Sequence, residues 1–466
     1  MEDRLNHKCG VFGVYGKDLN VAELTYFGLH ALQHRGQDSS GISVSNSKEI
    51  ITRKREGLVA QVFTKQDFKD LRGFIAIGHN RYSTSGGING CHIQPVTSKQ
   101  NIFSLAHNGN LPVTKPLEDF LSSKGVSTDG LNDSELMHRA IQYHLTKGAS
   151  AEEAIKKSFP LFTGAFSLLV LTKTKLIAVR DAYGIRPLAI GKLDDGYIVS
   201  SETCAIDVIG GKFVRDVKPG EMVVIDTNGI NSYQLAKPNL KLDIFEFVYF
   251  SRRDSMLLGK SVHGVRKNLG EQLAKECKIK ADVVISVPES ANSAAIGYAV
   301  ASGIPFDLGL VKNRFIGRTF ILPGQRQRNK SVQIKLNPIG EVINGKRIVV
   351  VDDSIVRGTT MKRLVAALRN RGAKEVHVLS SCPPIIFPDF YGIATPTQKE
   401  LIASRKTVPQ IKKYINADSL YFLSYKGMVK ATGLPEDVFC TSCFTGDYPI
   451  DIGEHAKEIT KPNFKY

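Results

Sequence analysis

The chain has 466 residues, of which 42% are hydrophobic and 23% are charged, the composition of an ordinary globular protein of two or three domains. It contains no apolar run of about 18 residues, and no apolar stretch follows the charges of MEDRLNHKCG, so we expect no transmembrane helix, no secretory signal and a cytoplasmic location. The net charge of +17 favours anionic partners, but no long block of like charges and no basic segment interleaved with aromatic residues indicates nucleic acid or membrane.

The first half of the chain alternates short apolar runs with glycine-rich turns. We expect strands within residues 9–16, 74–83, 101–109, 165–172 and 175–181. Helices are expected within residues 131–148 and 150–162, where apolar residues recur at helical spacing and Ser or Asp can cap the start. Strands with helices grouped outside them predict a layered α+β domain.

A polar stretch over residues 226–243 shows little helical or strand period, and we place the domain boundary there, after residue 235. Beyond it, strand-like and helical runs alternate, which predicts a parallel, doubly wound α/β sheet. The expected strands lie within residues 281–290, 347–354 and 375–384, and the expected helices within 293–303 and 361–371.

The segment RIVVVDDSIVRGTT carries the sharpest local pattern. Its continuous β-branched run predicts a strand that is covered on both faces, with Asp352 and Asp353 at the carboxyl end, where open α/β sheets bind ligands. The Gly-Thr-Thr loop that follows leads into a helix, whose first N–H groups can receive a phosphate. Two carboxylates would repel that phosphate, so they suit the vicinal hydroxyls of a ribose or Mg²⁺. The alternative is a capped helix after a strand.

This segment resembles the phosphoribosyl pyrophosphate signature of the phosphoribosyltransferase family. The resemblance implies that Ser290, from the upstream loop ISVPES, joins Asp352 and Asp353 around Mg²⁺. The substrate-binding residues that it implies in the signature are Asp352, Asp353, Ser354, Arg357, Gly358, Thr359 and Thr360. A basic segment between the two carries three further cations that we expect over the polyanion, with surface charge as the alternative: Lys312, Arg314 and Arg318.

Cys9 precedes the strand-like run GVFGVYG. A thiol nucleophile needs a base, and the free α-amino group of the first residue can serve, because its pKa of about 8 suits proton transfer near neutrality. Cys9 becomes the first residue only if residues 1–8 are removed, so we expect those residues to be a propeptide. By itself, a lone cysteine ahead of a strand is more often a core residue.

Four segments in order, KCGVFGVYG, LQHRGQDSSGI, GHNRYSTSG and AHNGNL, resemble glutamine amidotransferase domains with an N-terminal cysteine nucleophile. The resemblance implies that Arg81 holds the glutamine carboxylate and that Asp133 holds the α-ammonium group. It implies an oxyanion hole made by Asn108 and Gly109. It also implies that Arg35 and Gly36 lie beside the nucleophile and contribute to glutamine binding.

The two halves together are similar to the amidophosphoribosyltransferase family. The resemblance implies an αββα sandwich of the N-terminal-nucleophile type over residues 9–235 and a phosphoribosyltransferase-type parallel-sheet domain with a C-terminal extension over residues 236–466. It implies that ammonia released from glutamine reaches carbon 1 of phosphoribosyl pyrophosphate, forming 5-phosphoribosylamine. A homotetramer or homodimer and inhibition by purine nucleotides are implied as well.

Some members of this family hold a [4Fe–4S] cluster on four cysteines, the last two of which correspond to Cys440 and Cys443. The other two positions are Asp243 and Asp389 in this chain. Carboxylates are poor ligands for a cluster normally held by thiolates, so we expect no cluster. Cys382 lies seven residues before Asp389 and could replace one missing ligand.

Two alternatives from other functional classes remain. A regulator could keep the phosphoribosyl pyrophosphate loop and bind DNA through its basic surface, but it would have no use for the glutaminase residues, and no helix-turn-helix segment is evident. A non-catalytic paralogue is not excluded by the sequence.

Overall fold

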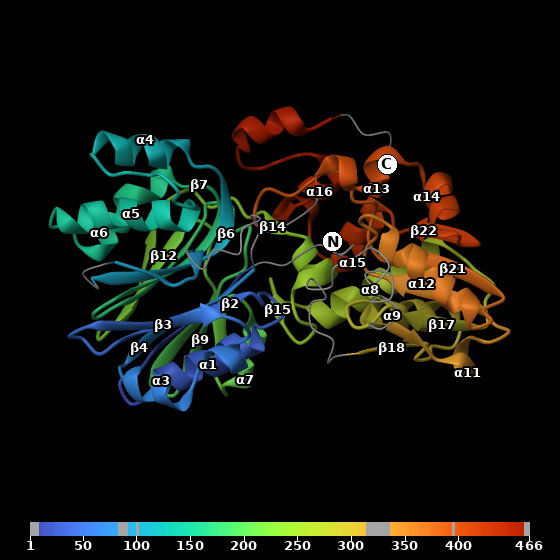
Figure 1. Ribbon diagram of the computed structural model, residues 1–466, viewed down its shortest axis with the longest axis horizontal. Helices are drawn as coiled ribbons and strands as arrows, with labels where there is room; N and C mark the ends of the chain where they lie inside the picture. Colours follow the sequence, from blue (N-terminus) through green and yellow to red (C-terminus); the bar gives the residue numbers. More distant parts are fainter. Residues whose placement is uncertain (1–8, 83–91, 99–101, 314–335, 394–396, 461–466) are drawn as a thin grey trace.

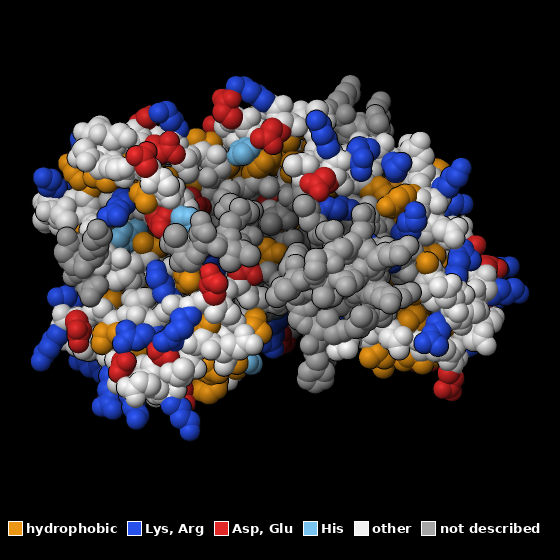
Figure 2. Space-filling model, viewed as in Figure 1, with side chains coloured by type: hydrophobic (Ala, Val, Ile, Leu, Met, Phe, Trp, Pro, Cys, Tyr) orange, Lys and Arg blue, Asp and Glu red, His pale blue; other side chains and the backbone are white. Residues whose placement is uncertain are grey.

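The computed structural model describes residues 9–82, 92–98, 102–313, 336–393 and 397–460. The chain forms two halves that lie side by side, the first coloured blue to green and the second yellow-green to red (Figure 1). Among the described residues, no helix has the length and apolar character needed to cross a lipid bilayer. Lysine and arginine side chains lie on both halves of the visible face, interspersed with aspartate and glutamate (Figure 2).

The first half contains two antiparallel sheets, of seven and six strands in the described part of the chain. In spatial order, the seven-stranded sheet contains β11 (Lys212–Asp216), β9 (Ala189–Leu193), β10 (Gly196–Ser200), β1 (Gly10–Tyr15), β4 (Ile75–Arg81), β2 (Ser39–Ser45) and β3 (Ile50–Glu56). The six-stranded sheet contains β13 (Gly229–Gln234), β12 (Glu221–Asp226), β8 (Leu176–Arg180), β7 (Thr163–Thr172), β6 (Phe103–Val113) and β5 (Val96–Thr97). Each of the five strands expected in this half is present.

The two sheets pack face to face, and helices cover both outer faces (Figure 1). Buried side chains of the two sheets meet between them, with Val11 and Ile77 from one sheet and Leu169 and Ala178 from the other. The helices of the seven-stranded sheet are α1 (Val21–Ala31), α2 (Val59–Val62), α3 (Lys65–Asp70) and α7 (Thr203–Val208). Those of the six-stranded sheet are α4 (Lys115–Ser123), α5 (Asp133–Thr146) and α6 (Ala151–Ser158). This is the αββα sandwich that the resemblance implied.

The polar stretch over residues 226–243 is more regular than its sequence indicates. Strand β13 lies within it and pairs with β12 over its whole length, from Glu221 opposite Gln234 to Asp226 opposite Gly229. No strand was predicted in this stretch from the sequence. Because β13 is an edge strand whose side chains are half-buried or exposed, it lacks the apolar alternation by which strands are recognised.

The second half is built on a parallel sheet of four strands in the described part of the chain, as predicted. Its order is β17 (Val283–Ser286), β20 (Arg347–Asp352), β21 (Glu375–Ser380) and β22 (Ser419–Phe422). The larger helices around it are α8 (Val262–Glu276), α9 (Asn292–Ser302), α12 (Thr359–Asn370), α14 (Val408–Ile415) and α15 (Tyr425–Thr432). Residues 348–351 of β20 are fully buried, which confirms a strand covered on both faces.

Backbone hydrogen bonds and a two-residue pair of parallel strands hold the two halves together where they meet. Lys241 N–H donates to Tyr183 O (2.7 Å) and Asp243 N–H donates to Ile185 O (3.1 Å). The next residues form β14 (Leu242–Asp243), which pairs in parallel with β23 (Phe439–Cys440) near the other end of the chain. The junction is therefore made by segments from both halves, and its residues Ile185 and Cys440 pack with Ala165 of β7.

Candidate active site

Cys9 lies where β1 begins, next to the end of β4. The two strands are antiparallel and pair Gly10 with Asn80, which brings Cys9 beside Arg81 and Tyr82. Burial raises the pKa of the Cys9 thiol to about 11, although a hydrogen bond with the Tyr82 backbone and the charge of Arg81 act in the opposite direction. The thiol is therefore protonated at neutral pH, and a reaction through its sulfur needs a base.

The turn at Arg35 and Gly36 also lies beside the start of β1 and the end of β4. A Cβ atom on Gly36 would lie 2.6 Å from the backbone carbon of Asn80, and one on Gly10 would lie 3.3 Å from the Cβ of Arg35. Both residues are therefore close to Cys9, and Gly36 has no room for a side chain.

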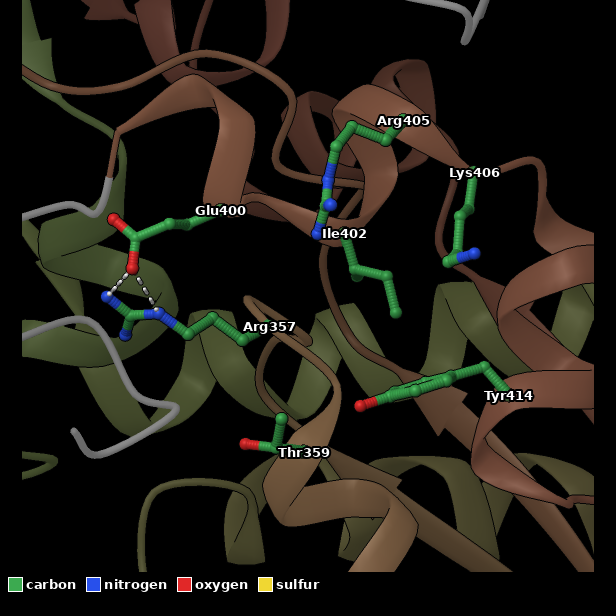
Figure 3. Close-up of a pocket in the computed structure, with 7 residues that line it drawn as sticks. All are labelled: Arg357, Thr359, Glu400, Ile402, Arg405, Lys406 and Tyr414. Carbon is green, nitrogen blue, oxygen red and sulfur yellow. Dashed lines mark hydrogen bonds and ion pairs between the residues drawn. The ribbon is translucent and has the colours of Figure 1, made fainter.

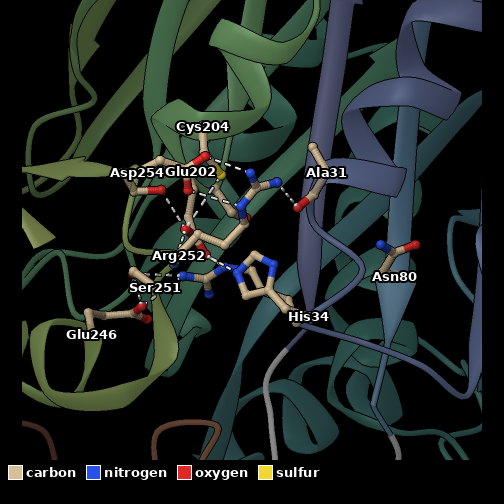
Figure 4. A network of polar contacts seen from close by, with 12 residues as sticks. Ala31, His34, Asn80, Glu202, Cys204, Glu246, Ser251, Arg252 and Asp254 are labelled. Carbon is tan, nitrogen blue, oxygen red and sulfur yellow. Dashed lines mark hydrogen bonds and ion pairs between the residues drawn. The ribbon is translucent and has the colours of Figure 1, made fainter. Parts of the chain in front are cut away.

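The Arg35 guanidinium, however, is turned toward carboxylates. Its Nε donates to Glu202 Oε1, and its Nη2 donates to Glu246 Oε2 (2.7 Å) in the second half of the chain. Figure 4 shows His34, Glu202, Glu246 and Ser251 of this network. Because the guanidinium is buried against these partners, any contact of Arg35 with glutamine would have to come from its backbone.

The predicted oxyanion hole lies on β6. Asn108 is fully buried; its Nδ2 donates to Ser201 Oγ at 3.5 Å, and its Oδ1 has no hydrogen-bond partner among the described residues. Gly109 has a φ of +152°, and a Cβ atom there would lie 2.0 Å from Ala165 O on β7. The backbone of Gly109 is thus pressed closely against its neighbouring strand.

Asp133 and Arg81 carry opposite charges and shift the pKa of Cys9 in opposite directions. Asp133 begins α5, its Oδ1 accepting from Ser134 N–H (2.7 Å) and its Oδ2 from Leu111 N–H (3.2 Å). Arg81 lowers and Asp133 raises the pKa of Cys9, so both side chains lie within electrostatic range of the thiol. A cation and an anion near a nucleophile suit a substrate that carries both a carboxylate and an ammonium group.

Three supporting residues were not identified from the sequence. Ser201 Oγ accepts from Val11 N–H (2.9 Å), connecting the strand after Cys9 to the Asn108 amide. His79 Nε2 lies 3.0 Å from His107 O. Burial lowers the pKa of His79 to about 3. Burial also lowers the pKa of His107, so both histidines are neutral supports rather than cations. The two histidines could have been identified from the sequence, because they lie inside the segments GHNRYSTSG and AHNGNL.

The predicted phosphate site lies at the carboxyl end of β20. Asp352 and Asp353 are buried there, and Ser354 Oγ donates to Asp353 Oδ1 (2.8 Å). Ser290, in the loop after β17, donates its hydroxyl to Asp353 Oδ2. The parallel pairing of β17 with β20 brings these two loops to the same edge of the sheet.

Gly358 is the residue before α12 and has a left-handed φ of +76°. The left-handed backbone favours glycine, and a Cβ atom there would also lie 2.8 Å from Ile402 Cδ1. Thr359 and Thr360 are the first residues of the twelve-residue helix α12, so their N–H groups are among those that point out of the start of the helix. The loop geometry therefore fits an anion.

A pocket of about 360 Å³ adjoins this loop (Figure 3). It is lined by Arg357, Thr359, Glu400, Ile402, Arg405, Lys406 and Tyr414. Arg357 donates from Nη2 (3.0 Å) and Nε (3.2 Å) to Glu400 Oε1. Arg357 is therefore paired in this structure, although it lies in the predicted loop.

Of the three cations predicted over the substrate, Lys312 ends β18 (Leu310–Lys312) and is exposed. Arg314 and Arg318 lie outside the described residues.

The oxygen donors at the sheet edge fit Mg²⁺. Ser290, Asp352 and Asp353 supply a hydroxyl and carboxylates at one place, which are the ligand types that this ion prefers. No group of three or more His, Cys, Asp or Glu side chains in the described part of the chain could hold a metal by itself. An ion here would therefore take further ligands from water and from substrate phosphates, as Mg²⁺ usually does.

The residues at the cluster positions do not fit an iron–sulfur cluster. Asp243 accepts from Arg186 Nη1 (2.7 Å), and Asp389 lies 3.6 Å from Arg186 Nη2, so a guanidinium stands among the carboxylates. Burial, and next the charge of Asp243, raise the pKa of Cys440 to about 12, and the pKa of Cys443 is raised as well. A cluster normally held by four thiolates would meet two carboxylates and a guanidinium here, and these groups do not suit it.

In the described part of the chain, Cys382 does not combine with Cys440 and Cys443 into a group that could hold a metal ion. Its Sγ donates to Pro383 O (3.2 Å), and burial is the main cause that raises its pKa, with Asp353 and Asp352 contributing. The carboxylates that act on Cys440 and Cys443 are instead Asp243 and Asp389. Cys382 thus belongs to the surroundings of the phosphate site.

Fold and site together define a two-part class of protein: an N-terminal-nucleophile glutamine amidotransferase joined to a phosphoribosyltransferase. The family model described as a glutamine amidotransferase domain matches residues 79–208, and that described as a phosphoribosyl transferase domain matches residues 258–386.

Full-length relatives identify the family. The chain is 44% identical to the amidophosphoribosyltransferase of Bacillus subtilis, covering 97% of this chain and 98% of the relative. It is 46% identical to that of Synechocystis sp., covering 97% and 92%. Its fold is similar to the B. subtilis glutamine phosphoribosylpyrophosphate amidotransferase complexed with ADP and GMP, with a TM-score of 0.89, 44% identity and coverage of 96% and 98%. The chain belongs to the amidophosphoribosyltransferase family.

Proposed function

We propose that this chain catalyses the glutamine-dependent synthesis of 5-phosphoribosylamine from phosphoribosyl pyrophosphate, releasing glutamate and pyrophosphate. The observation that carries the proposal is the grouping of Arg81, Asp133 and the Asn108–Gly109 pair around Cys9, in a chain that also carries the phosphate loop. Membership of the amidophosphoribosyltransferase family supports the same activity. The alternatives, a regulator or a non-catalytic paralogue, receive no such support.

In the first half-reaction, Arg81 binds the carboxylate of glutamine and Asp133 binds its α-ammonium group. Cys9 Sγ then attacks the side-chain amide carbon, and the thiol proton passes through the base to the leaving ammonia. The oxyanion of the tetrahedral intermediate accepts hydrogen bonds from the Asn108 amide and Gly109 N–H, each such donor being worth roughly 3 to 4 kcal/mol in other enzymes. Water hydrolyses the resulting thioester to glutamate.

The base is the α-amino group of Cys9 after removal of residues 1–8. In the chain that retains residues 1–8 the thiol is protonated at neutral pH and has no base, which the free α-amino group would supply after processing. The two buried histidines nearby do not serve well, since His79 has a pKa of about 3 and His107 a lowered one.

In the second half-reaction, the ammonia travels inside the protein to carbon 1 of the ribose as pyrophosphate leaves. Asp352 and Asp353 accept from the ribose hydroxyls, and the loop from Ser354 to Thr360 receives the phosphate at the start of α12. Lys312, Arg314 and Arg318 attract the polyanion.

Mg²⁺, held by Ser290, Asp352 and Asp353, would neutralise charge on the departing pyrophosphate. No iron–sulfur cluster forms on this chain, because two of the four ligand positions hold carboxylates, Asp243 and Asp389, that face Arg186.

The division into a propeptide over residues 1–8, a glutaminase domain over 9–235 and a transferase domain over 236–466 is part of this proposal. So are a cytoplasmic location, a homotetramer or homodimer, and no nucleic-acid or membrane partner. A B. subtilis relative is described in complex with ADP and GMP, which supports purine nucleotides as inhibitors of this chain.

One set of measurements tests the proposal. The intact mass and N-terminal sequence of the purified protein report removal of residues 1–8, and a glutaminase assay with and without phosphoribosyl pyrophosphate reports coupling. Cys9→Ser is expected to abolish glutamine-dependent synthesis and to spare synthesis from free ammonia. Loss of both activities in a folded variant would contradict two separate sites.

A further inference from the structure

A loop of the second half, residues 389–393, lies directly against the predicted oxyanion strand of the first half. Gly392 has a φ of +107°, and a Cβ atom there would lie 3.0 Å from the carbonyl carbon of Gly109 and 3.1 Å from its oxygen. One residue further along β6, Asn110 Nδ2 donates to Phe390 O (2.9 Å). The loop thus contacts β6 at two successive residues, through the backbone of Gly109 and the side chain of Asn110.

Gly109 has little freedom to move away from this loop. On the side of the neighbouring strand, a Cβ atom at Gly109 would lie only 2.0 Å from Ala165 O. The backbone of Gly109 is therefore in close contact with both Ala165 and Gly392, and a change at either residue would shift the Gly109 backbone.

The loop is held in shape by Asp389 and Arg186. Asp389 Oδ1 accepts from Tyr391 N–H and Ile393 N–H, both at 2.8 Å. Arg186, in the first half, donates to Tyr391 O from Nε (2.8 Å) and from Nη2 (2.6 Å). Gly392 lies between these attachment points.

Arg186 is itself fixed by carboxylates from the second half. Its side chain is fully buried; Nη1 donates to Asp243 (2.7 Å), and Glu246 Oε1 lies 3.7 Å away. Glu246 also accepts from Arg35, whose backbone lies beside Cys9. The guanidinium is therefore part of a buried ion network that runs from the nucleophile to the loop.

We propose that Gly392 and Arg186 are positioning residues of the glutaminase reaction: Arg186 holds the loop, and the Gly392 backbone supports Gly109 in the geometry that binds the oxyanion. This rests on the proposed function, since it takes Gly109 N–H as an oxyanion donor. Such donors work only when held within about 0.5 Å of the required place. The transferase half thus completes the active site of the glutaminase half.

Gly392→Ala tests the contact, with Gly229→Ala as a matched control. Gly229, in the hairpin between β12 and β13, has a similar φ of +98°, but a Cβ atom there would have no neighbour within 4 Å among the described residues. Both variants acquire a methyl group at a left-handed residue, but only Gly392→Ala presses on Gly109. We expect Gly392→Ala to lower kcat for glutaminase by roughly tenfold or more, with KM for glutamine within about twofold of wild type. Synthesis from free ammonia should be unchanged in both variants.

Arg186→Lys and Asn110→Ser extend the test with smaller changes. Lysine keeps the charge but cannot reproduce the two hydrogen bonds to Tyr391 O, and serine removes only the donor to Phe390 O. Both should lower glutaminase kcat more than synthesis from ammonia, and Asn110→Ser serves even if the other variants do not fold.

Equal glutaminase activity in Gly392→Ala and Gly229→Ala, or an equal fall of both activities in the folded variants, would overturn the inference. An inactive wild-type glutaminase would instead overturn the proposed function. Measuring wild type in the same assay separates the two failures.

Discussion

Glu202 allows a quantitative test of the buried ion network. Its Oε1 accepts from Arg35 and from His34 (2.7 Å), and its Oε2 accepts from Ser255 Oγ (2.6 Å) and Arg252 N–H (2.8 Å). Glu202→Gln removes the negative charge of the carboxylate and places an amide NH₂ group, itself a donor, against the hydrogen-bond donors around it. Because Arg35 would stay buried with one of its two carboxylate partners gone, we expect a loss of about 3–5 kcal/mol in the free energy of unfolding.

Urea unfolding followed by circular dichroism at neutral pH measures this loss as a lower midpoint at constant slope. The control is Asp254→Asn, because Asp254 pairs with Arg252 at 2.6 Å but its side chain is 55% exposed. Such an exposed pair is worth at most about 1 kcal/mol. A midpoint for Glu202→Gln that falls no further than that of Asp254→Asn would refute the reasoning.

The stability difference between wild type and Glu202→Gln should depend on pH with a definite sign. Burial alone would raise the pKa of Glu202, but Arg35 and His34 bring it well below its usual value. A carboxyl group with a depressed folded-state pKa stabilises the protein above its unfolded pKa, and this stabilisation is lost as the pH falls through the folded value. The difference between the two proteins should therefore be largest at neutral pH and shrink in acid.

Three further predictions concern catalysis. Asn108→Ala should lower kcat for glutaminase by roughly 10²–10³-fold while ammonia-dependent synthesis is retained. Steady-state assays with glutamine and with ammonia measure this, and an equal fall of both activities would contradict the prediction. Asp353→Asn should lower synthesis from both donors by roughly tenfold or more and raise the Mg²⁺ concentration required, as a titration of activity with MgCl₂ would measure. In the chain that retains residues 1–8, alkylation of Cys9 by iodoacetamide should rise about tenfold per pH unit from neutrality toward its pKa of about 11. Mass spectrometry measures the alkylation rate, and a rate that levels off near pH 8 would show that the pKa of the thiol is not raised.

Local patterns were enough to predict some of the strands and the loop before α12, whereas strands such as β2, β3, β9 and β12 were not predicted. The run from Ile348 to Val351 is apolar without alternation, and the structure confirms a strand buried on both faces. Gly358 was predicted to lie in the turn before a helix, and it has the left-handed backbone that this turn requires. By contrast, β13 was missed, because an edge strand has no continuous apolar face.

The side-chain directions at the candidate site were not predictable in the same way. The sequence indicates that Arg35 lies beside Cys9, but its guanidinium points to Glu202 and Glu246, 167 and 211 residues further along the chain. Nothing in the local sequence distinguishes Arg186, and its partner Tyr391 is 205 residues away.

The sequence by itself thus determined the class of fold, the order of the two halves and the residue types at each site, because these depend on neighbouring residues along the chain. Only the tertiary structure decided that Arg35 serves the junction between the halves and that Gly392 meets Gly109. Such contacts depend on how distant segments pack and on which buried charges must find partners, and neither is recorded in the local pattern of the residues involved.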